Sequence, residues 1–184
     1  MDVTDFPGLH RIRLLARWVR LLCAVAALGL MLAHVWIWTH PELLENVARR
    51  QWTVGDSALL QFGPGNRLLG AVVSLPSLLV ALVGLWQLWR LFGCYARGLV
   101  FAAEPVRRLH SVGWAVTALA PLLPLSQTFA VLALSWNNPP GTRLLVFTVS
   151  SEHYLALLFG LVLLAMARIM QEAQRVAQEN AEFI

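Results

Sequence analysis

Four polar side chains in otherwise apolar segments are the residues of this sequence best suited to ligand or acid–base chemistry. His34 lies near the end of the first apolar run, Gln127 lies in the third, and Glu152 and His153 begin the fourth. Ionisable groups in a membrane segment are costly and often mark a functional site. We therefore interpret these four residues as the candidate lining of a ligand cavity in the outer half of the protein. The preferred alternative is structural, because such side chains also join helices by hydrogen bonds or reach interfacial water.

Motifs of metal sites and of catalysis are missing from the sequence. There is no HExxH and no paired CxxC, the spacings that bring metal ligands together. Glu152 and His153 are neighbours, and successive helical residues point about 100° apart, so they form no dyad. The sequence predicts no catalytic residue, no metal site and no cofactor, with a His34–His153 pair of metal or haem ligands as the alternative. Cys23 and Cys94 are interpreted as small buried hydrophobes.

The composition is that of a membrane protein. Of the 184 residues, 58% are hydrophobic and 13% are charged, whereas a soluble domain carries about 25% charged residues. All 14 basic residues are arginine, and they bracket apolar runs without forming a basic patch. Direct binding of nucleic acid is therefore not expected.

Four apolar runs are long enough to cross a bilayer as helices, which takes about 20 residues. They extend over about residues 18–38, 68–92, 112–136 and 149–170. Lipid cannot satisfy free backbone groups, so each run must be helical. The fold class is therefore all-α, with the whole chain as a single domain of four transmembrane helices.

The arginines predict the orientation of these helices. One side of the predicted membrane collects ten of them: Arg11, Arg13, Arg17, Arg20, Arg90, Arg97, Arg107, Arg108, Arg168 and Arg175. The other side collects four: Arg49, Arg50, Arg67 and Arg143. Because the arginine-rich side is cytoplasmic, we expect both chain ends on the cytoplasmic side of a bacterial inner membrane.

Two helical segments are expected outside the spans. The segment 41–50 predicts a short helix on the outer membrane surface, with an apolar edge of Leu43, Leu44 and Val47. The tail 171–184 predicts a cytoplasmic extension of the fourth helix. The outer turn "NNPPG" is interpreted as a tight turn without a function. Small residues spaced by four are candidates for close helix packing or a homo-oligomer contact: Gly29 and Ala33, Gly70 and Ser74, Ser77 and Ala81, Ala156 and Gly160.

Short motifs in the inner loop and tail resemble those of the bacterial domain-of-unknown-function family 2975, which are small four-helix membrane proteins. The motif residues are Leu91, Phe92, Tyr95, Gly98, Phe101, Glu104, Leu109, Gly113 and Trp114, followed by the ending "AQENAEFI" after Glu172. The chain departs from the family pattern at Ala102–Pro105, where a Thr or Ser cap and an Asn are common. It also departs at Gln171 and Ala173, where a Gly is common.

The resemblance implies a regulatory or interaction protein without catalysis, because family members resemble partners of small helix-turn-helix regulators. The residues expected to meet such a cytoplasmic partner are Arg107, Arg108, Glu172 and Glu179. The alternative is a small transporter or a cofactor-binding subunit with its site in the outer half of the bundle.

Overall fold

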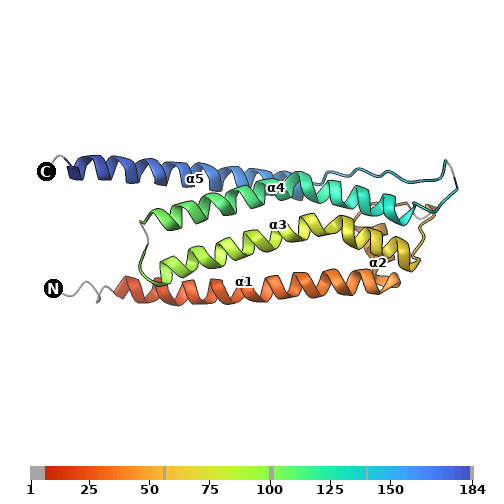
Figure 1. The fold of residues 1–184 in the computed structure, drawn as a ribbon, viewed down its shortest axis with the longest axis horizontal. Coiled ribbons are helices and arrows are strands. Elements are labelled where there is room, and N and C mark those ends of the chain that lie inside the picture. Colours follow the sequence, from red (N-terminus) through yellow and green to blue (C-terminus); the bar gives the residue numbers. More distant parts are fainter. Residues whose placement is uncertain (1–6, 56, 100–101, 140, 183–184) are drawn as a thin grey trace. The chain divides into compact units, whose positions relative to one another are not determined.

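A computed structural model describes residues 7–55, 57–99, 102–139 and 141–182, with side chains described from residue 13 to residue 179. Phe101, Phe183, Ile184 and the side chain of Arg11 lie outside this part. Within it the chain is all-α, as predicted, and five helices follow one another (Figure 1). They are α1 (Pro7–Thr39), α2 (Pro41–Arg50), α3 (Pro64–Ala96), α4 (Ala103–Leu134) and α5 (Ser151–Glu182).

The four long helices α1, α3, α4 and α5 are each long and apolar enough to cross a membrane. The helices α1 and α3 contain the first two predicted spans, and α4 and α5 cover all but two residues of the third and of the fourth. The predicted tail helix is the end of α5, which reaches Glu182, and α4 begins at Ala103, nine residues before the predicted third span. Pro76 lies inside α3, and Pro121 and Pro124 lie inside α4.

Two helix ends differ by two residues from the approximate span boundaries predicted, and both lie at the connection between α4 and α5. The third span was expected to reach Trp136, but α4 ends at Leu134, where the Ser135 hydroxyl donates to the carbonyl oxygen of Leu132. The fourth was expected from Val149, but residues up to Ser150 are non-helical. The Thr128 hydroxyl donates to the Val146 carbonyl at 2.9 Å, so side chains of α4 hold this segment in place of helical bonds.

The chain folds into two compact units, and α1, α3, α4 and α5 each contribute to both. Unit 1 takes the residues up to Ala27, Ala81–Thr117 and those from Leu157 on. Unit 2 takes Leu28–Val80 and Ala118–Ala156.

In unit 1, α4 and α5 approach each other closely at two glycines. A Cβ added at Gly160 would lie 2.7 Å from the backbone nitrogen of Thr117. One added at Gly113 would lie 3.0 Å from the backbone nitrogen of Leu164. These contacts place the two helices antiparallel and side by side, and they confirm Gly160 as a packing residue.

Unit 2 has a hydrophobic core around Trp38, Leu44, Ala130 and Leu134. The helix predicted over 41–50 is present as α2, with Pro41 at its first position. Its buried edge consists of Leu44 and Ala48, whereas Leu43 is 39% exposed. The apolar edge of α2 thus packs into protein, because Leu44 meets the core.

Candidate functional site

A carboxylate surrounded by arginines organises one end of unit 1. Glu104 lies in the first turn of α4, where the helix dipole favours a negative charge. Its oxygens lie 3.3 Å from Arg108, 3.8 Å from Arg97 and 4.0 Å from Arg90. Arg108 also donates to Gln87 at 2.9 Å. These contacts join the end of α3 to the beginning of α4 across the turn at Gly98, whose φ is +80°.

Tryptophan rings contact three arginines of unit 1, two of which also meet Glu104. The guanidinium of Arg20 lies 4.2 Å from the ring centre of Trp89, which links α1 to α3. Arg90 lies 5.3 Å from the ring of Trp86, and Arg108 lies 6.0 Å from it. Cation–π contacts of this kind fix the guanidinium groups at the faces of the rings.

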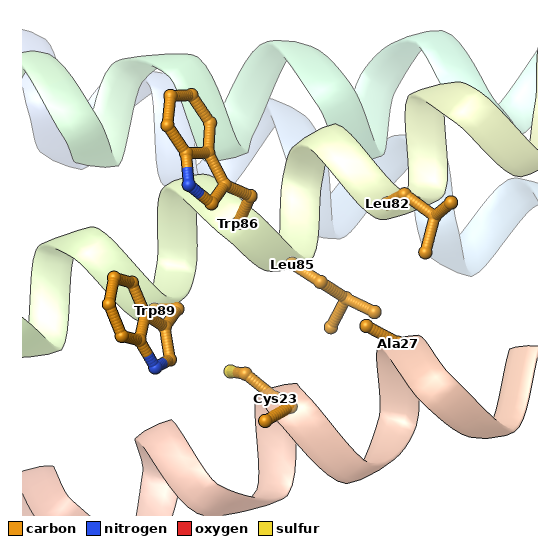
Figure 2. Close-up of a pocket in the computed structure, with 7 residues that line it drawn as sticks. Cys23, Ala27, Leu82, Leu85, Trp86 and Trp89 are labelled. Carbon is orange, nitrogen blue, oxygen red and sulfur yellow. The ribbon is translucent and has the colours of Figure 1, made fainter.

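An apolar cavity of about 310 Å³ lies between α1 and α3 in unit 1. Figure 2 shows Cys23 and Ala27 of α1 pointing toward α3, and Leu85 of α3 pointing toward α1. Cys23 and Cys94 are free and buried, as predicted. The cavity is lined by aliphatic side chains, the indole rings of Trp86 and Trp89 and one thiol, which suits an apolar chain and provides no acid–base pair.

Two hollows flank Gln174, whose side-chain nitrogen donates to the Ala102 carbonyl at 3.0 Å. The basic hollow, of about 480 Å³, is lined by Glu104, Arg107, His110, Arg168, Gln171 and Gln174, among others. The apolar hollow, of about 490 Å³, is lined by Ala102, Met170, Ala173, Gln174, Ala177 and Gln178, among others. Both lie between the beginning of α4 and the last turns of α5.

The four residues predicted to meet a partner lie in different surroundings, two on α4 and two on α5. Arg107 lines the basic hollow and is exposed. Arg108 is only 16% exposed and is engaged by Glu104. On α5, Glu172 and Glu179 both pair with Arg175 along an exposed face of the helix.

The four residues predicted to line an outer cavity all lie in unit 2. No interaction joins any two of them in the described part of the chain. His34 is half-buried, bonds to the backbone of Ala71 and lies 6.4 Å from the ring of Trp38. Gln127 is half-buried and Glu152 is exposed. The outer ligand cavity therefore stays a prediction.

His153 has a local structural role at the beginning of α5. Its Nδ1 accepts a hydrogen bond from the Ser150 backbone nitrogen at 3.0 Å. In return, the His153 backbone nitrogen donates to the Ser150 carbonyl at 3.1 Å. This reciprocal arrangement resembles a capping box, which satisfies backbone groups at a helix start. Across the residues that the structure describes, no group of three or more His, Cys, Asp or Glu side chains could hold a metal ion.

Several structurally important polar residues were not predicted from the sequence. Arg90 and Arg97 entered only the prediction of orientation, and Glu104 only the family motif. The spacing of Glu104 and Arg108 by four on a helix was the available signal. Asn138 was not predicted either; it is buried and donates to the Leu59 carbonyl at 2.7 Å.

The fold and the sites together define a small multi-pass helical membrane protein, with a basic hollow and an apolar hollow in unit 1. The family described as protein of unknown function (DUF2975) matches residues 37–184, which include all of α2 to α5. The chain belongs to this family, as the resemblance predicted. No curated protein and no solved structure matches it.

Proposed function

We propose that this chain is a regulatory protein of a bacterial inner membrane, without catalysis, that binds a cytoplasmic protein partner. In this proposal both chain ends are cytoplasmic, and the partner is a small helix-turn-helix regulator, as the family resemblance implies. The observation that carries the proposal is the apolar hollow beside α5. This hollow lies on the part of the helix that continues past the predicted span.

The apolar hollow has the chemistry of a protein-docking site. Ala102, Met170, Ala173 and Ala177 leave room between α4 and α5 for one or two apolar side chains. An amphipathic helix docks in this way, with its apolar face in a groove. Next to Ala103 in the chain, Glu104 joins the beginning of α4 to Arg90 of α3 and to Arg97.

The acidic residues predicted to meet the partner lie on the face of α5 that is turned away from the apolar hollow. Glu172 and Glu179 share Arg175, so the three side chains together carry one net negative charge. The partner in this proposal therefore also carries a basic segment, whose arginine or lysine side chains complement this second face of α5. Arg107 lines the basic hollow, on the other side of Gln174. Arg108 lies near it and positions Glu104.

Site-specific photocrosslinking in the native cells tests the proposal. A photoreactive phenylalanine analogue at Ala173 or Ala177 should capture one soluble DNA-binding protein of small size. The matched control carries the analogue at Ser57, an exposed residue of the predicted outer loop, and should not capture it. Ala177→Trp, which fills the hollow, should abolish the crosslink from Ala173.

Two outcomes would contradict the proposal. Capture of only a second copy of this chain would make the groove a homo-oligomer contact. Equal capture of the same soluble protein from Ser57 would show that the crosslink does not depend on the groove.

A further inference from the structure

Two arginines of the basic hollow lack the acidic partners that other arginines of unit 1 have. Arg90, Arg97 and Arg108 pair with Glu104, and Arg175 pairs with Glu172 and Glu179. Among the residues whose side chains are described, Arg107 and Arg168 form no ion pair. Both line the basic hollow and both are exposed.

The one carboxylate in the wall of the basic hollow does not neutralise these two arginines. Glu104 faces three other guanidinium groups at 3.3 to 4.0 Å. Its negative charge is therefore already more than balanced. The hollow keeps the two positive charges of Arg107 and Arg168, and its ligand must be an anion.

The packing of α4 on α5 places the two arginines on opposite walls of the hollow. Gly113 meets Leu164, and Ala102 meets Gln174, in one antiparallel register. Along the chain, Arg107 lies between Ala102 and Gly113. Arg168 lies one turn after Leu164 on α5. Guanidinium groups from two walls suit a phosphate group, whose oxygens accept bidentate hydrogen bonds. A volume of about 480 Å³ accommodates a small ligand rather than a bare ion.

Apolar side chains beside the hollow indicate that the phosphate belongs to a lipid. Trp114 follows Arg107 by two turns on the same face of α4 and is 57% exposed. Its ring lies 6.4 Å from His110, which lines the hollow. On α5, Leu161 precedes Arg168 by two turns on the same face and is 50% exposed. Both apolar residues lie toward the helix centres, where acyl chains would run.

We propose that the basic hollow binds the headgroup of an anionic phospholipid, with its phosphate between Arg107 and Arg168. His110 and Gln171 supply further hydrogen-bonding groups from the two walls. Basic pockets between transmembrane helices bind anionic headgroups in this manner. The site is separate from the apolar hollow on the other side of Gln174, so a lipid and a protein partner can bind at the same time.

Native mass spectrometry of the purified full chain tests this site. The protein in detergent is incubated with phosphatidylglycerol or with phosphatidylcholine of the same acyl chains. The wild type should retain phosphatidylglycerol in preference. Arg107→Gln with Arg168→Gln should lower the affinity for phosphatidylglycerol at least about tenfold, since each charged hydrogen bond is worth that much. Arg107→Lys with Arg168→Lys should keep part of the preference, because the charges remain.

The matched control removes two exposed arginines of α1, Arg13→Gln with Arg17→Gln, which lie outside the hollow. This variant should retain phosphatidylglycerol like the wild type. Circular dichroism of every variant should show unchanged helix content. Equal loss of lipid from both double variants would overturn the proposal. Displacement of the lipid by an equal concentration of inorganic phosphate would overturn it too, since the site would then take a soluble anion.

Discussion

At the scale of single residues, Glu104 shows how one side chain can organise several elements. Its carboxylate meets Arg90 and Arg97 from α3 and the following stretch, and Arg108 from its own helix. A lone surface ion pair contributes little to stability, but a network around one charge contributes more. Glu104 therefore fixes the turn between α3 and α4, against which the last turns of α5 pack through Gln174.

Replacement of Glu104 by glutamine should weaken this end of unit 1. Glu104→Gln leaves three guanidinium groups close together without a carboxylate, so the thermal unfolding temperature of the protein in detergent should fall. Glu172→Gln removes an exposed carboxylate from α5 and should have little effect. The difference between the variants should shrink in high salt, which screens exposed charges. Equal unfolding temperatures at low salt would show that the network does not stabilise the turn.

A second residue-scale prediction concerns Asn138, in the turn that the sequence analysis treated as having no function. Its amide donates to Leu59 at 2.7 Å and to Thr142 at 3.3 Å, and so joins two loops of unit 2. Asn138→Ala leaves two carbonyl groups without this donor, so it should lower the free energy of unfolding by about 1–3 kcal/mol. Asn46→Ala removes only an exposed bond within α2, to the Glu42 carbonyl. It should change the free energy of unfolding by less than about 0.5 kcal/mol. Chemical denaturation measures both values.

The sequence predicted correctly those residues whose burial depends only on the hydrophobicity of the segment around them. Cys23 and Cys94 follow from the apolar runs around them, and both are buried. The roles of Asn138 and Glu104 depend on partners such as Leu59 and Arg90, which are distant along the chain. No spacing within one segment indicates such partners. The contacts of His153 with Ser150 are local, but the sequence did not indicate them because they depend on where α5 begins.

At the scale of elements, the contact between α4 and α5 depends on two glycines. A methyl group at Gly160 would meet the Thr117 backbone at 2.7 Å, whereas one at Gly29 would meet nothing within 4 Å. Both glycines were predicted as packing residues from their four-residue spacing to a small neighbour. In the structure only Gly160 has a close neighbour on another helix. The spacing of small residues indicates a candidate face, but it does not indicate which element packs on that face.

The same substitution at these two glycines tests the helix contact. Gly160→Ala should destabilise the protein by about 1–3 kcal/mol, because overpacking forces α4 and α5 apart. Gly29→Ala should be neutral or stabilising by up to about 1 kcal/mol, because alanine favours the helix. Unfolding in detergent gives the free energies. A stabilised Gly160→Ala variant would contradict the close contact, and a changed oligomeric state in Gly29→Ala would assign that glycine to a contact between copies.

Element existence followed from the sequence more reliably than element ends. The four spans required only the length and apolarity of each run, and the structure has helices over all four. The end of α4 at Leu134 depends on hydrogen bonds of Ser135 and Thr128 to neighbouring backbone. Such side-chain bonds compete with the helix, and hydropathy does not detect them.

At the scale of the whole molecule, the arginines serve two purposes that the sequence alone could not separate. Their number on each side is the basis of the predicted orientation, with the arginine-rich side cytoplasmic. By contact they differ, because Arg90, Arg97 and Arg108 share the carboxylate of Glu104, whereas Arg107 and Arg168 form no ion pair with a described side chain. The first group holds helices together, and the second is available to a ligand. A count of charges predicts the topology, but only the pairing of charges locates a site.

The proposed topology can be tested with single cysteines and a charged maleimide that does not cross membranes. The native thiols give a low background, since Cys23 is 5% exposed and Cys94 is fully buried. Ser57→Cys places a thiol in the predicted outer loop, and Gln178→Cys places one near the end of α5; both positions are exposed. In right-side-out membrane vesicles only the first should be labelled, and in inverted vesicles only the second. The reverse pattern would place the hollows of unit 1 outside the cytoplasm, where a cytoplasmic regulator could not reach them.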